Sequence, residues 1–563
     1  LAMRIKPSLA YLEKAEKKEH ATSERLDGLF RRILLPLIEK RSLGWLFMAI
    51  LVGGFFVSIS LFYLKQVTVK MLPLDNKPEF SVVLDMPEGT ALGATANTLR
   101  LLTQTLREIP EVVALQTYAG TAKPFDFNGM VRHYYLRGKP WQGELQVQLV
   151  DKGERARTSH EIAIQAREML TPMAREAGAR ITVVEMPPGP PVLQAVVAEV
   201  YGPDAKTRRQ VATDLTEMFE QTESLADVDN YMQADHHILR FEVDTQKAVR
   251  RGISVDTVIR NLDMAMGEYK LGDVKRAGFL EPTYIVLQVP LAVRAQLTRL
   301  ADLPIPTQDG NTVPLAELGR FVKAEQDPVT YHKDLRPLEY VVGDAVGKFG
   351  APIYPMFEIA DRLADYTAPD GEQIAGRFTG PPPDDGKSGF EWAGEWTVTY
   401  ETFRDMGIAF GVALLLIYML VVAEFGNFVT PAVIMAPIPL TLLGIVPGHW
   451  FLGAEFTATS MIGFIALAGI IVRNSILLVD FSIEEVQKGM AVKEAVISAC
   501  KARTRPILIT AFALVAGSSV ILTDPIFQGM AISLLFGVMV STVLTLVVIP
   551  LGCVSAGNYL RKT

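Results

Sequence analysis

MIGFIALAGIIVRNSILLVDF, residues 461–481, is an apolar run with a single arginine, Arg473, near its middle. A run of this length and composition is typical of a helix that crosses a membrane. A cation near the bilayer centre costs about 2.5–3.5 kcal/mol on insertion scales, so it is kept where it faces protein and meets an acidic partner. No other apolar run of this chain has an aspartate or glutamate at its centre. We therefore expect the partner of Arg473 to lie on another chain or on a further part of this one, or to be a transported ion.

The composition indicates a chain with both membrane and soluble parts, because hydrophobic residues make up 49% and charged residues still reach 21%. Six runs are long enough to cross about 30 Å of hydrocarbon. They are Leu43–Leu64, Met406–Ala423, Phe428–Leu452, Ala458–Val479, Pro506–Leu522 and Phe527–Val554. The third run is broken by Pro431, Pro437, Pro439 and Pro447. The net charge of −7 and the lack of a basic stripe exclude a nucleic-acid partner.

Lysine and arginine near the ends of the runs predict the orientation, since cytoplasmic loops are rich in both. They precede the first run, fill the loop between the fourth and fifth, and follow the sixth, as Arg25, Arg31, Arg32, Lys40, Arg41, Lys488, Lys493, Lys501, Arg503, Arg505, Arg561 and Lys562. Both ends are therefore expected in the cytoplasm. Residues 1–42 form a cytoplasmic amphipathic segment, residues 43–64 the first span, and residues 405–557 the other five.

The segment between the first two spans repeats a strand, a loop and a helix, and it is large enough for two or more domains. FSVVLDMPEGT, residues 80–90, leads into a helical stretch with apolar residues at helical spacing: Leu99, Leu102, Leu106 and Ile109. Four such units predict two ferredoxin-like β-α-β subdomains, at 76–188 and at 189–237 with 330–385. A further subdomain is inserted at 238–329, where HILRFEV reads as a strand and Ser254 as a helix cap. The alternative is a repetitive α+β surface domain.

Four stretches resemble those of a known family. They are AEFGNFVTPAVIMAPIPLTLLG (423–444), GIIVRNSILLVDF (469–481), ARTRPILITAFALVAG (502–517) and FEVDTQKAVRRGISVDTVIRNL (241–262). The chain resembles the C-terminal half of a resistance–nodulation–cell division (RND) efflux pump of the drug-type branch. The resemblance implies that the two β-α-β subdomains are porter subdomains and that the insertion at 238–329 is a docking subdomain. It implies an N-terminal half that carries two intramembrane aspartates and six more spans. It also implies a homotrimer in a bacterial inner membrane, with a periplasmic adaptor and an outer-membrane channel, driven by the proton-motive force without a cofactor.

The resemblance implies a proton relay. Arg473 is the cation that pairs with the aspartates when they are ionised, because a nearby positive charge favours the carboxylate. Asn474 offers a neutral donor and acceptor beside it, and Thr510 a hydroxyl one turn into the fifth span. Arg503, at the mouth of that span, matches a family residue linked to proton passage. The alternatives are ordinary packing for Thr510, a topology anchor for Arg503 and a snorkelling side chain for Arg473.

Substrate contacts are expected in LQTYAGTAKPFDFNGMVRHYYLRG, residues 115–138, which is dense in aromatic residues. Methionine and flat rings adapt to varied apolar ligands. The candidate substrate-binding residues are Tyr118, Phe125, Phe127, Met130 and Tyr134. The region resembles the part of the family's sequence that forms a phenylalanine-lined pocket and a switch loop. The alternative is that these rings form the core of a β-hairpin.

Two other functions stay open. A heavy-metal exporter needs a methionine cluster, but Met130, Met186, Met218 and Met232 are scattered along the sequence. A membrane sensor or scaffold needs no carboxylate opposite Arg473. An enzyme is disfavoured, because the seven histidines show no metal-ligand or nucleophile–base spacing.

Overall fold

The computed structural model describes residue 24 and residues 27–186, 189, 192–267, 269–347 and 350–557. Most of the predicted segment 1–42 lies outside these residues, although residues 27–39 are helical. The chain divides into two compact units. The first unit comprises Leu1–Met86, Ala91–Met232 and Thr330–Thr563, and the second comprises Pro87–Thr90 and Gln233–Val329. The second unit covers nearly the same residues as the predicted insertion.

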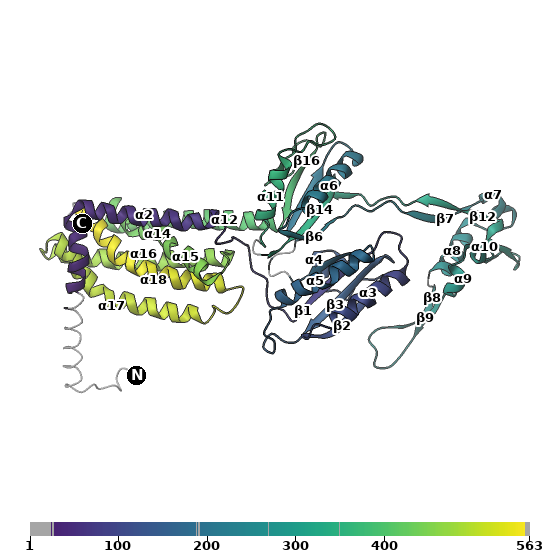
Figure 1. The fold of residues 1–563 in the computed structure, drawn as a ribbon, viewed down its shortest axis with the longest axis horizontal. Coiled ribbons are helices and arrows are strands. Elements are labelled where there is room, and N and C mark those ends of the chain that lie inside the picture. The colour runs from purple at the N-terminus through teal and green to yellow at the C-terminus, as the bar shows by residue number, and fades with distance from the viewer. Residues whose placement is uncertain are drawn as a thin grey trace. The chain divides into compact units, whose positions relative to one another are not determined.

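The first subdomain of unit 1 is a four-stranded antiparallel sheet with two helices (Figure 1). Its elements are β1 (Glu79–Asp85), α3 (Leu92–Leu106), β2 (Val112–Ala119), β3 (Gln142–Leu149), α5 (Ser159–Glu176) and β4 (Arg180–Val184). The strand order is β2-β3-β1-β4. Leu99, Leu102, Leu106 and Ile109 are buried in the core, so the predicted apolar stripe is confirmed.

The second subdomain is built around the sheet β13-β14-β5-β16-β15, with β6 paired to β14. Its elements are β5 (Val196–Tyr201), α6 (Ala205–Glu220), β6 (Leu225–Asn230), β13 (Tyr331–Lys333), β14 (Arg336–Ala345), α11 (Ile353–Leu363), β15 (Gly376–Arg377) and β16 (Gly389–Gly394). The sheet extends past the predicted boundary at 385, because β16 pairs with β5 along its whole length. Phe219, Phe390 and Trp392 fill the core.

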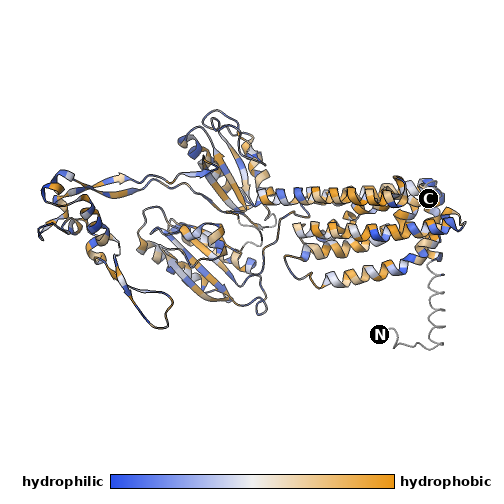
Figure 2. Ribbon diagram, turned by 180° about the vertical axis from the view of Figure 1, so that it is seen from behind, coloured by the Kyte–Doolittle hydropathy of each residue, from blue (hydrophilic) through white to orange (hydrophobic). Residues whose placement is uncertain are grey.

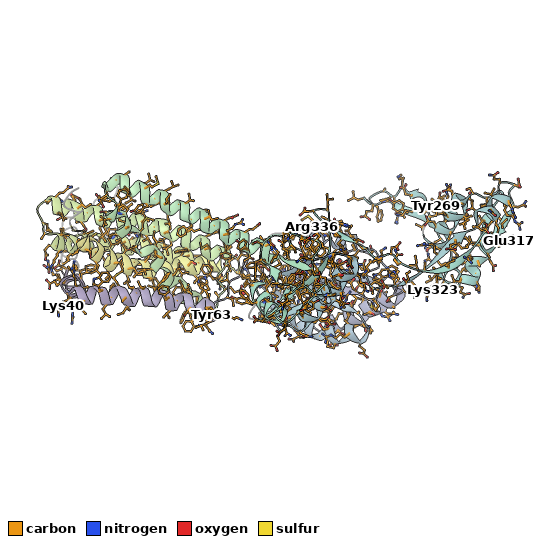
Figure 3. All side chains as sticks on the ribbon, turned by 90° about the horizontal axis from the view of Figure 1, so that it is seen from above. Lys40, Tyr63, Tyr269, Glu317, Lys323 and Arg336 are labelled. Atoms are coloured by element: carbon orange, nitrogen blue, oxygen red, sulfur yellow. The ribbon has the colours of Figure 1, made fainter. Side chains whose placement is uncertain are left out.

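The described residues of unit 2 form three separate two-stranded sheets. Its elements are β7 (His237–Val243), α7 (Thr245–Arg250), α8 (Val255–Met266), β8 (Tyr269–Val274), β9 (Thr283–Leu287), α9 (Leu291–Arg294), α10 (Leu297–Ala301), β10 (Pro304–Pro306), β11 (Thr312–Pro314), η3 (Leu315–Glu317) and β12 (Gly319–Glu325). The predicted strand is β7, which pairs with β12. The predicted cap is confirmed, since the Ser254 side chain accepts a hydrogen bond from the Thr257 amide. Figure 3 labels Tyr269, Glu317 and Lys323 in this unit.

Apolar helices, most of them long, form much of the remainder of unit 1, and their hydrophobic colouring is visible in Figure 2. They are α2 (Arg41–Tyr63), α12 (Glu395–Phe425), α13 (Val429–Met435), α14 (Pro437–Leu440), α15 (Leu442–Leu452), α16 (Ala458–Gln487), α17 (Val492–Ser519) and α18 (Gln528–Ser555). Lys40 and Tyr63 mark the two ends of α2 (Figure 3). The third predicted run forms three short helices, with Pro437 at the start of α14; Pro431 and Pro447, which were also predicted to break the run, lie inside α13 and α15.

Five helical stretches among the described residues are long and apolar enough to cross a membrane: α2, α12, α13 to α15, α16 and α18. Residues 506–519 of the predicted fifth run, Pro506–Leu522, form the C-terminal part of α17. The N-terminal part of α17 is charged, with Lys493, Glu494, Lys501, Arg503 and Arg505. α18 packs against α15, α16 and α17.

The segment after α2 is joined by backbone hydrogen bonds to the segment that begins α16. Val69 forms a parallel β-bridge with Phe456. The Phe456 amide donates to the Thr68 carbonyl at 2.8 Å, the Lys70 amide donates to the Phe456 carbonyl at 3.1 Å, and a third bond runs from Ala458 to Met71 at 3.0 Å. The Tyr354 hydroxyl, on α11, accepts a hydrogen bond from the Val69 amide at 3.1 Å. The start of α16 is thus linked to the second subdomain.

Candidate functional site

Arg473 lies on an exposed stripe of α16. The opposite face is buried against neighbouring helices through Leu467, Ile471 and Leu478. The exposed stripe repeats every three or four residues, through Ile462, Ala466, Gly469, Arg473 and Leu477. Among the described residues, no carboxylate forms an ion pair with Arg473. The small side chains at Ala466 and Gly469 leave room for another helix to approach closely.

The other predicted relay residues lie on α16 and α17, which pack against each other. Asn474 follows Arg473 on α16 and is half-buried. The hydroxyl of Thr510, on α17, donates to carbonyls of its own helix, at 2.8 Å to Ile507 and 3.1 Å to Pro506. The Arg503 guanidinium lies 5.3 Å from the ring centroid of Phe481 on α16, as a cation–π contact that joins the two helices.

The aromatic segment connects β2 to β3 and contains α4 (Phe127–Val131) and η2 (Tyr134–Leu136). Phe125 is 69% exposed, Met130 44% and Phe127 39%, so these three side chains are not the core of a hairpin. Tyr118 is half-buried on β2, where its hydroxyl donates to Gln116 at 2.9 Å. Tyr134 is half-buried beside the Arg137 guanidinium, 5.7 Å from the Tyr134 ring centroid. The segment therefore presents exposed rings on a folded support.

A buried lysine anchors the start of this segment to the sheet. Lys123 Nζ donates to Ser81 Oγ at 2.5 Å and to Gln146 Oε1 at 2.7 Å. It also forms ion pairs with Asp126 at 2.8 Å and with Glu144, a fully buried carboxylate, at 3.3 Å. Burial raises the pKa of Glu144, and the charge of Lys123 opposes that rise. The only sign of this network in the sequence was the polar face of β3, Glu144 and Gln146.

Two arginines attach the C-terminal end of the aromatic segment to the two sheets. Arg137 donates to the Asp85 carboxylate at 2.9 Å and to the Leu84 carbonyl at 2.7 Å, both on β1. Arg132 donates to the Asp344 carboxylate at 3.2 Å, across to β14 of the second subdomain. The aromatic segment is therefore fixed to both sheets.

Three tyrosines of the second subdomain gather near this contact, and no local pattern indicates the cluster because Tyr231 lies about a hundred residues before the other two. Tyr231, Tyr331 and Tyr340 lie with their ring centroids 5.6–5.9 Å apart. Burial raises the pKa of Tyr340 to about 12. Burial also raises the pKa of Tyr231, and the nearby Tyr134 raises it further. The rings stay neutral at physiological pH and offer flat faces with hydroxyl groups, which suits mixed apolar and polar ligands.

A bundle of apolar helices with an exposed cation, joined to two β-sheet subdomains, defines a membrane protein with a large extramembrane part. The AcrB/AcrD/AcrF family matches residues 2–352 and 383–554 of the chain. The chain therefore belongs to this family, which is part of the RND superfamily of efflux pumps.

Relatives of differing description match the chain at low identity. It is 23% identical over 363 residues to the swarming motility protein SwrC of Bacillus subtilis, covering 62% of this chain and 32% of the relative. It is 22% identical over 421 residues to the multidrug resistance protein MdtC of Cronobacter sakazakii, covering 72% and 38%. It is 23% identical over 369 residues to the cobalt-zinc-cadmium resistance protein CzcA of Cupriavidus metallidurans, covering 63% and 32%. The matches thus span about a third of each relative.

A crystal structure of a heavy metal efflux pump has the same fold. The TM-score is 0.72 at 20% identity, and the superposition covers 96% of this chain and 51% of the pump. The chain thus spans about half the length of that structure.

Proposed function

We propose that this chain is the C-terminal half of a proton-driven RND transporter that exports hydrophobic or amphiphilic compounds. The observation that carries the proposal is Arg473, a cation on an exposed, apolar and small-residue stripe of α16. Such a stripe is covered in a membrane by another helix that brings the opposite charge. The proposal includes six spans, with the apolar half of α17 as the fifth. It also includes two ferredoxin-like subdomains, for which the order β2-β3-β1-β4 of the first sheet is the support.

The relay is proposed to work by exchange of a charge pair. Arginine stays charged in proteins and binds both oxygens of a carboxylate, so Arg473 is not itself the proton carrier. When an aspartate of the N-terminal half is ionised, it pairs with Arg473; when the aspartate is protonated, the pair is released and the helices shift. Asn474 and Thr510 supply neutral hydrogen-bonding groups along the path. Arg503 lies at its cytoplasmic end.

The extramembrane part is proposed to bind substrate between the aromatic segment and the tyrosines of the second subdomain. The pump is proposed to act in a bacterial inner membrane as a homotrimer, with both ends of this chain in the cytoplasm. A periplasmic adaptor and an outer-membrane channel complete the export path. The proton-motive force drives export without a cofactor.

The proposed orientation predicts the labelling of two introduced cysteines. Gln308 lies in unit 2 and Gln487 at the end of α16, and both side chains are exposed. In cells with a permeable outer membrane, Gln308→Cys should react with a membrane-impermeant thiol reagent, whereas Gln487→Cys should react only after the inner membrane is broken. The native Cys500 and Cys553 are buried, so background labelling should be low. The opposite pattern would overturn the orientation.

Metal export is the second candidate, because CzcA is among the relatives and a heavy metal efflux pump is among the solved structures with this fold. The described methionines favour organic substrates instead. Met218 and Met232 pack against the core of the second subdomain, whereas Met130 is exposed on α4 of the first. A sensor or scaffold is the third candidate and would need no carboxylate partner for Arg473.

Alanine changes in the aromatic segment separate drug-type from metal-type export. Each of Phe125, Phe127 and Tyr118 offers a ring that buries roughly 150–250 Å² against a ligand. Losing one such contact costs about 1–2 kcal/mol, or roughly a five- to thirtyfold change in affinity. We expect losses that differ among dyes, detergents and antibiotics, with unchanged tolerance to copper, silver, zinc and cobalt.

The readout is a susceptibility panel of cells that express the complete pump, with expression checked for each variant. Phe125 and Phe127 are exposed, so their alanine variants should remain folded. Leu136→Ala is a matched control, because Leu136 is also exposed in this segment but lacks a ring. A uniform loss across the panel would contradict a role in binding. A selective loss of metal tolerance would favour the metal branch.

A further inference from the structure

A buried histidine on α15 is bonded to the start of α16. His449 is 0% exposed, and both of its ring nitrogens have a hydrogen-bond partner. Nδ1 lies 2.8 Å from the Ile445 carbonyl of the same helix, which can only accept, so Nδ1 carries a proton. Nε2 lies 2.9 Å from the Ser460 hydroxyl on α16. In the neutral ring, Nε2 therefore accepts a hydrogen bond from Ser460.

A short series of hydroxyl groups continues from Ser460 to α18. Ser460 Oγ lies 3.2 Å from Oγ1 of Thr457, the N-cap of α16, which lies 2.8 Å from Thr459 Oγ1. The Thr459 hydroxyl donates to the carbonyl of Ile526, two residues before α18 begins, at 2.9 Å. We call His449, Thr457, Thr459 and Ser460 the His449 network. Hydrogen bonds depend on direction as well as distance, so the network fixes the start of α16 in one register against α15 and α18.

Tight packing surrounds the His449 network. A Cβ atom on Gly529 of α18 would collide with Ser460 Oγ and Thr457 Oγ1, so the α18 backbone lies directly against these hydroxyls. The His449 ring lies 5.4 Å from the Phe456 ring, measured between centroids. Phe456 in turn pairs with Val69 in the junction described above. The network therefore lies where α15, α16, α18 and the segment after α2 meet.

The register at Ser460 also determines where Arg473 lies. α16 is one helix from Ala458 to Gln487 and contains no proline. Arg473 follows Ser460 by 13 residues, or about 20 Å along the axis at 1.5 Å per residue. A helix without a kink keeps the spacing of its residues, so fixing Ser460 fixes the depth of Arg473 in the bundle.

We propose that His449 is a positioning residue of the proton relay. Through Ser460 and Thr459 it holds the start of α16 against α15 and α18, and it thereby sets the depth of Arg473 opposite the carboxylate of the N-terminal half. A histidine suits this role because one ring nitrogen bonds its own helix while the other reaches a neighbouring helix. The proposal rests on the transport function proposed above, because that function supplies the carboxylate.

Two variants each remove one bond of the network and keep the imidazole. Ser460→Ala removes the bond to His449, and Thr459→Val removes the bond to Ile526 with little change of shape. Thr459→Ser keeps the hydroxyl and should behave as wild type. Ser482→Ala is the matched control, because Ser482 is also fully buried on α16 but its hydroxyl donates to a carbonyl of its own helix.

The first measurement does not depend on transport. Hydrogen–deuterium exchange of the full chain in detergent should be roughly tenfold faster in the first turn of α16 for Ser460→Ala and for Thr459→Val, because each loses a buried hydrogen bond. Exchange in α17 should not change, and the two control variants should match wild type. Unchanged exchange in Ser460→Ala and Thr459→Val would overturn the proposal.

A double variant tests the part played by His449 itself. His449→Leu and Ser460→Ala remove the same bond, so the double variant should exchange no faster than His449→Leu alone. Additive effects of the two changes would show that the bond between these residues does not hold the helix.

The second measurement is the pH profile of energised export by the complete pump in proteoliposomes. A carboxylate from which Arg473 has moved away is more easily protonated, so the limb where export falls with rising pH should move upward by about 0.5 pH unit or more in Ser460→Ala and Thr459→Val. The maximal rate should fall while KM stays within about twofold of wild type. Because Thr459→Val keeps both His449 and Ser460, a shift shared by the two variants does not come from the loss of the imidazole.

The outcomes separate this proposal from the transport function. A rate that falls equally at every pH, with the limb unmoved, would show that the network is only structural and would overturn the positioning role. If the wild-type pump exports nothing in a proton gradient while exchange follows the predicted pattern, the transport function fails and the attachment of α16 through His449 stands.

Discussion

Arg473→Ala in the complete pump is expected to stop energised export while expression and assembly persist. Without the cation, a buried carboxylate opposite α16 keeps its proton far above its ordinary pKa, because burial disfavours the charged form. The carboxylate then no longer forms and breaks an ion pair during the transport cycle. The measurement is substrate export by proteoliposomes under an imposed proton gradient, compared with wild type at equal protein.

Arg473→Lys should be milder, since it keeps the charge but loses the two-pronged contact with a carboxylate. Lys488→Ala is the matched control, because it removes a cation from the end of the same helix, where Lys488 pairs with Glu484 and Glu485. Such exposed pairs contribute little, so this variant should export normally. If Arg473→Ala retains more than about half the wild-type rate, the relay assignment is wrong.

Lys123→Met should strongly destabilise the first subdomain. Lys123 is 5% exposed and Glu144 fully buried, and removing one partner of such a pair costs about 3–5 kcal/mol. Amides of β1 and β3 should exchange with deuterium roughly a hundredfold faster or more, up to the limit set by global unfolding. Mass spectrometry of the full chain in detergent measures this directly, with intrinsic exchange rates corrected for pH.

The effect should depend on pH in a defined direction. Burial raises the pKa of Glu144 and Lys123 opposes that rise, so loss of Lys123 raises the pKa further. The pKa of Glu144 is then higher in the folded state than in the unfolded state. The free energy of unfolding therefore falls as pH rises through the folded-state pKa. The destabilisation should therefore be smaller at about pH 5 than at about pH 8. Replacing both residues, as Lys123→Met with Glu144→Leu, should restore most of the protection. Unchanged exchange in Lys123→Met would show that the pair is not structural.

The sequence predicts those parts of the fold that depend on local pattern. The stripe of Leu99, Leu102 and Leu106 is set by the period of a helix, and it is buried as predicted. The third apolar run is interrupted next to Pro437, at the start of α14, whereas Pro431 and Pro447 lie inside α13 and α15. The extent of α17 was predicted less well, because a helix continues through charged residues that a search for apolar runs leaves out.

The site is less predictable, because its parts meet through long-range packing. Arg473 stands out in the sequence, since one cation interrupts an apolar run. The pair of Arg132 and Asp344 joins residues 212 positions apart, and no local period indicates it. The tyrosine cluster and the hydrogen bond between His449 and Ser460 likewise depend on how separate strands and helices are brought together.

The hydrogen-bonded junction between residues 68–71 and 456–458 couples any axial movement of α16 to the segment that follows α2. Three backbone bonds of 2.8–3.1 Å join the two segments, and a donor–acceptor separation of about 3.6 Å is no longer a hydrogen bond. A slide of α16 by one residue, about 1.5 Å along its axis, would either break these bonds or pull residues 68–71 with it. Tyr354 holds that same segment from the second subdomain. An axial displacement of α16 at Arg473 would therefore be transmitted through residues 68–71 to α11 of the second subdomain.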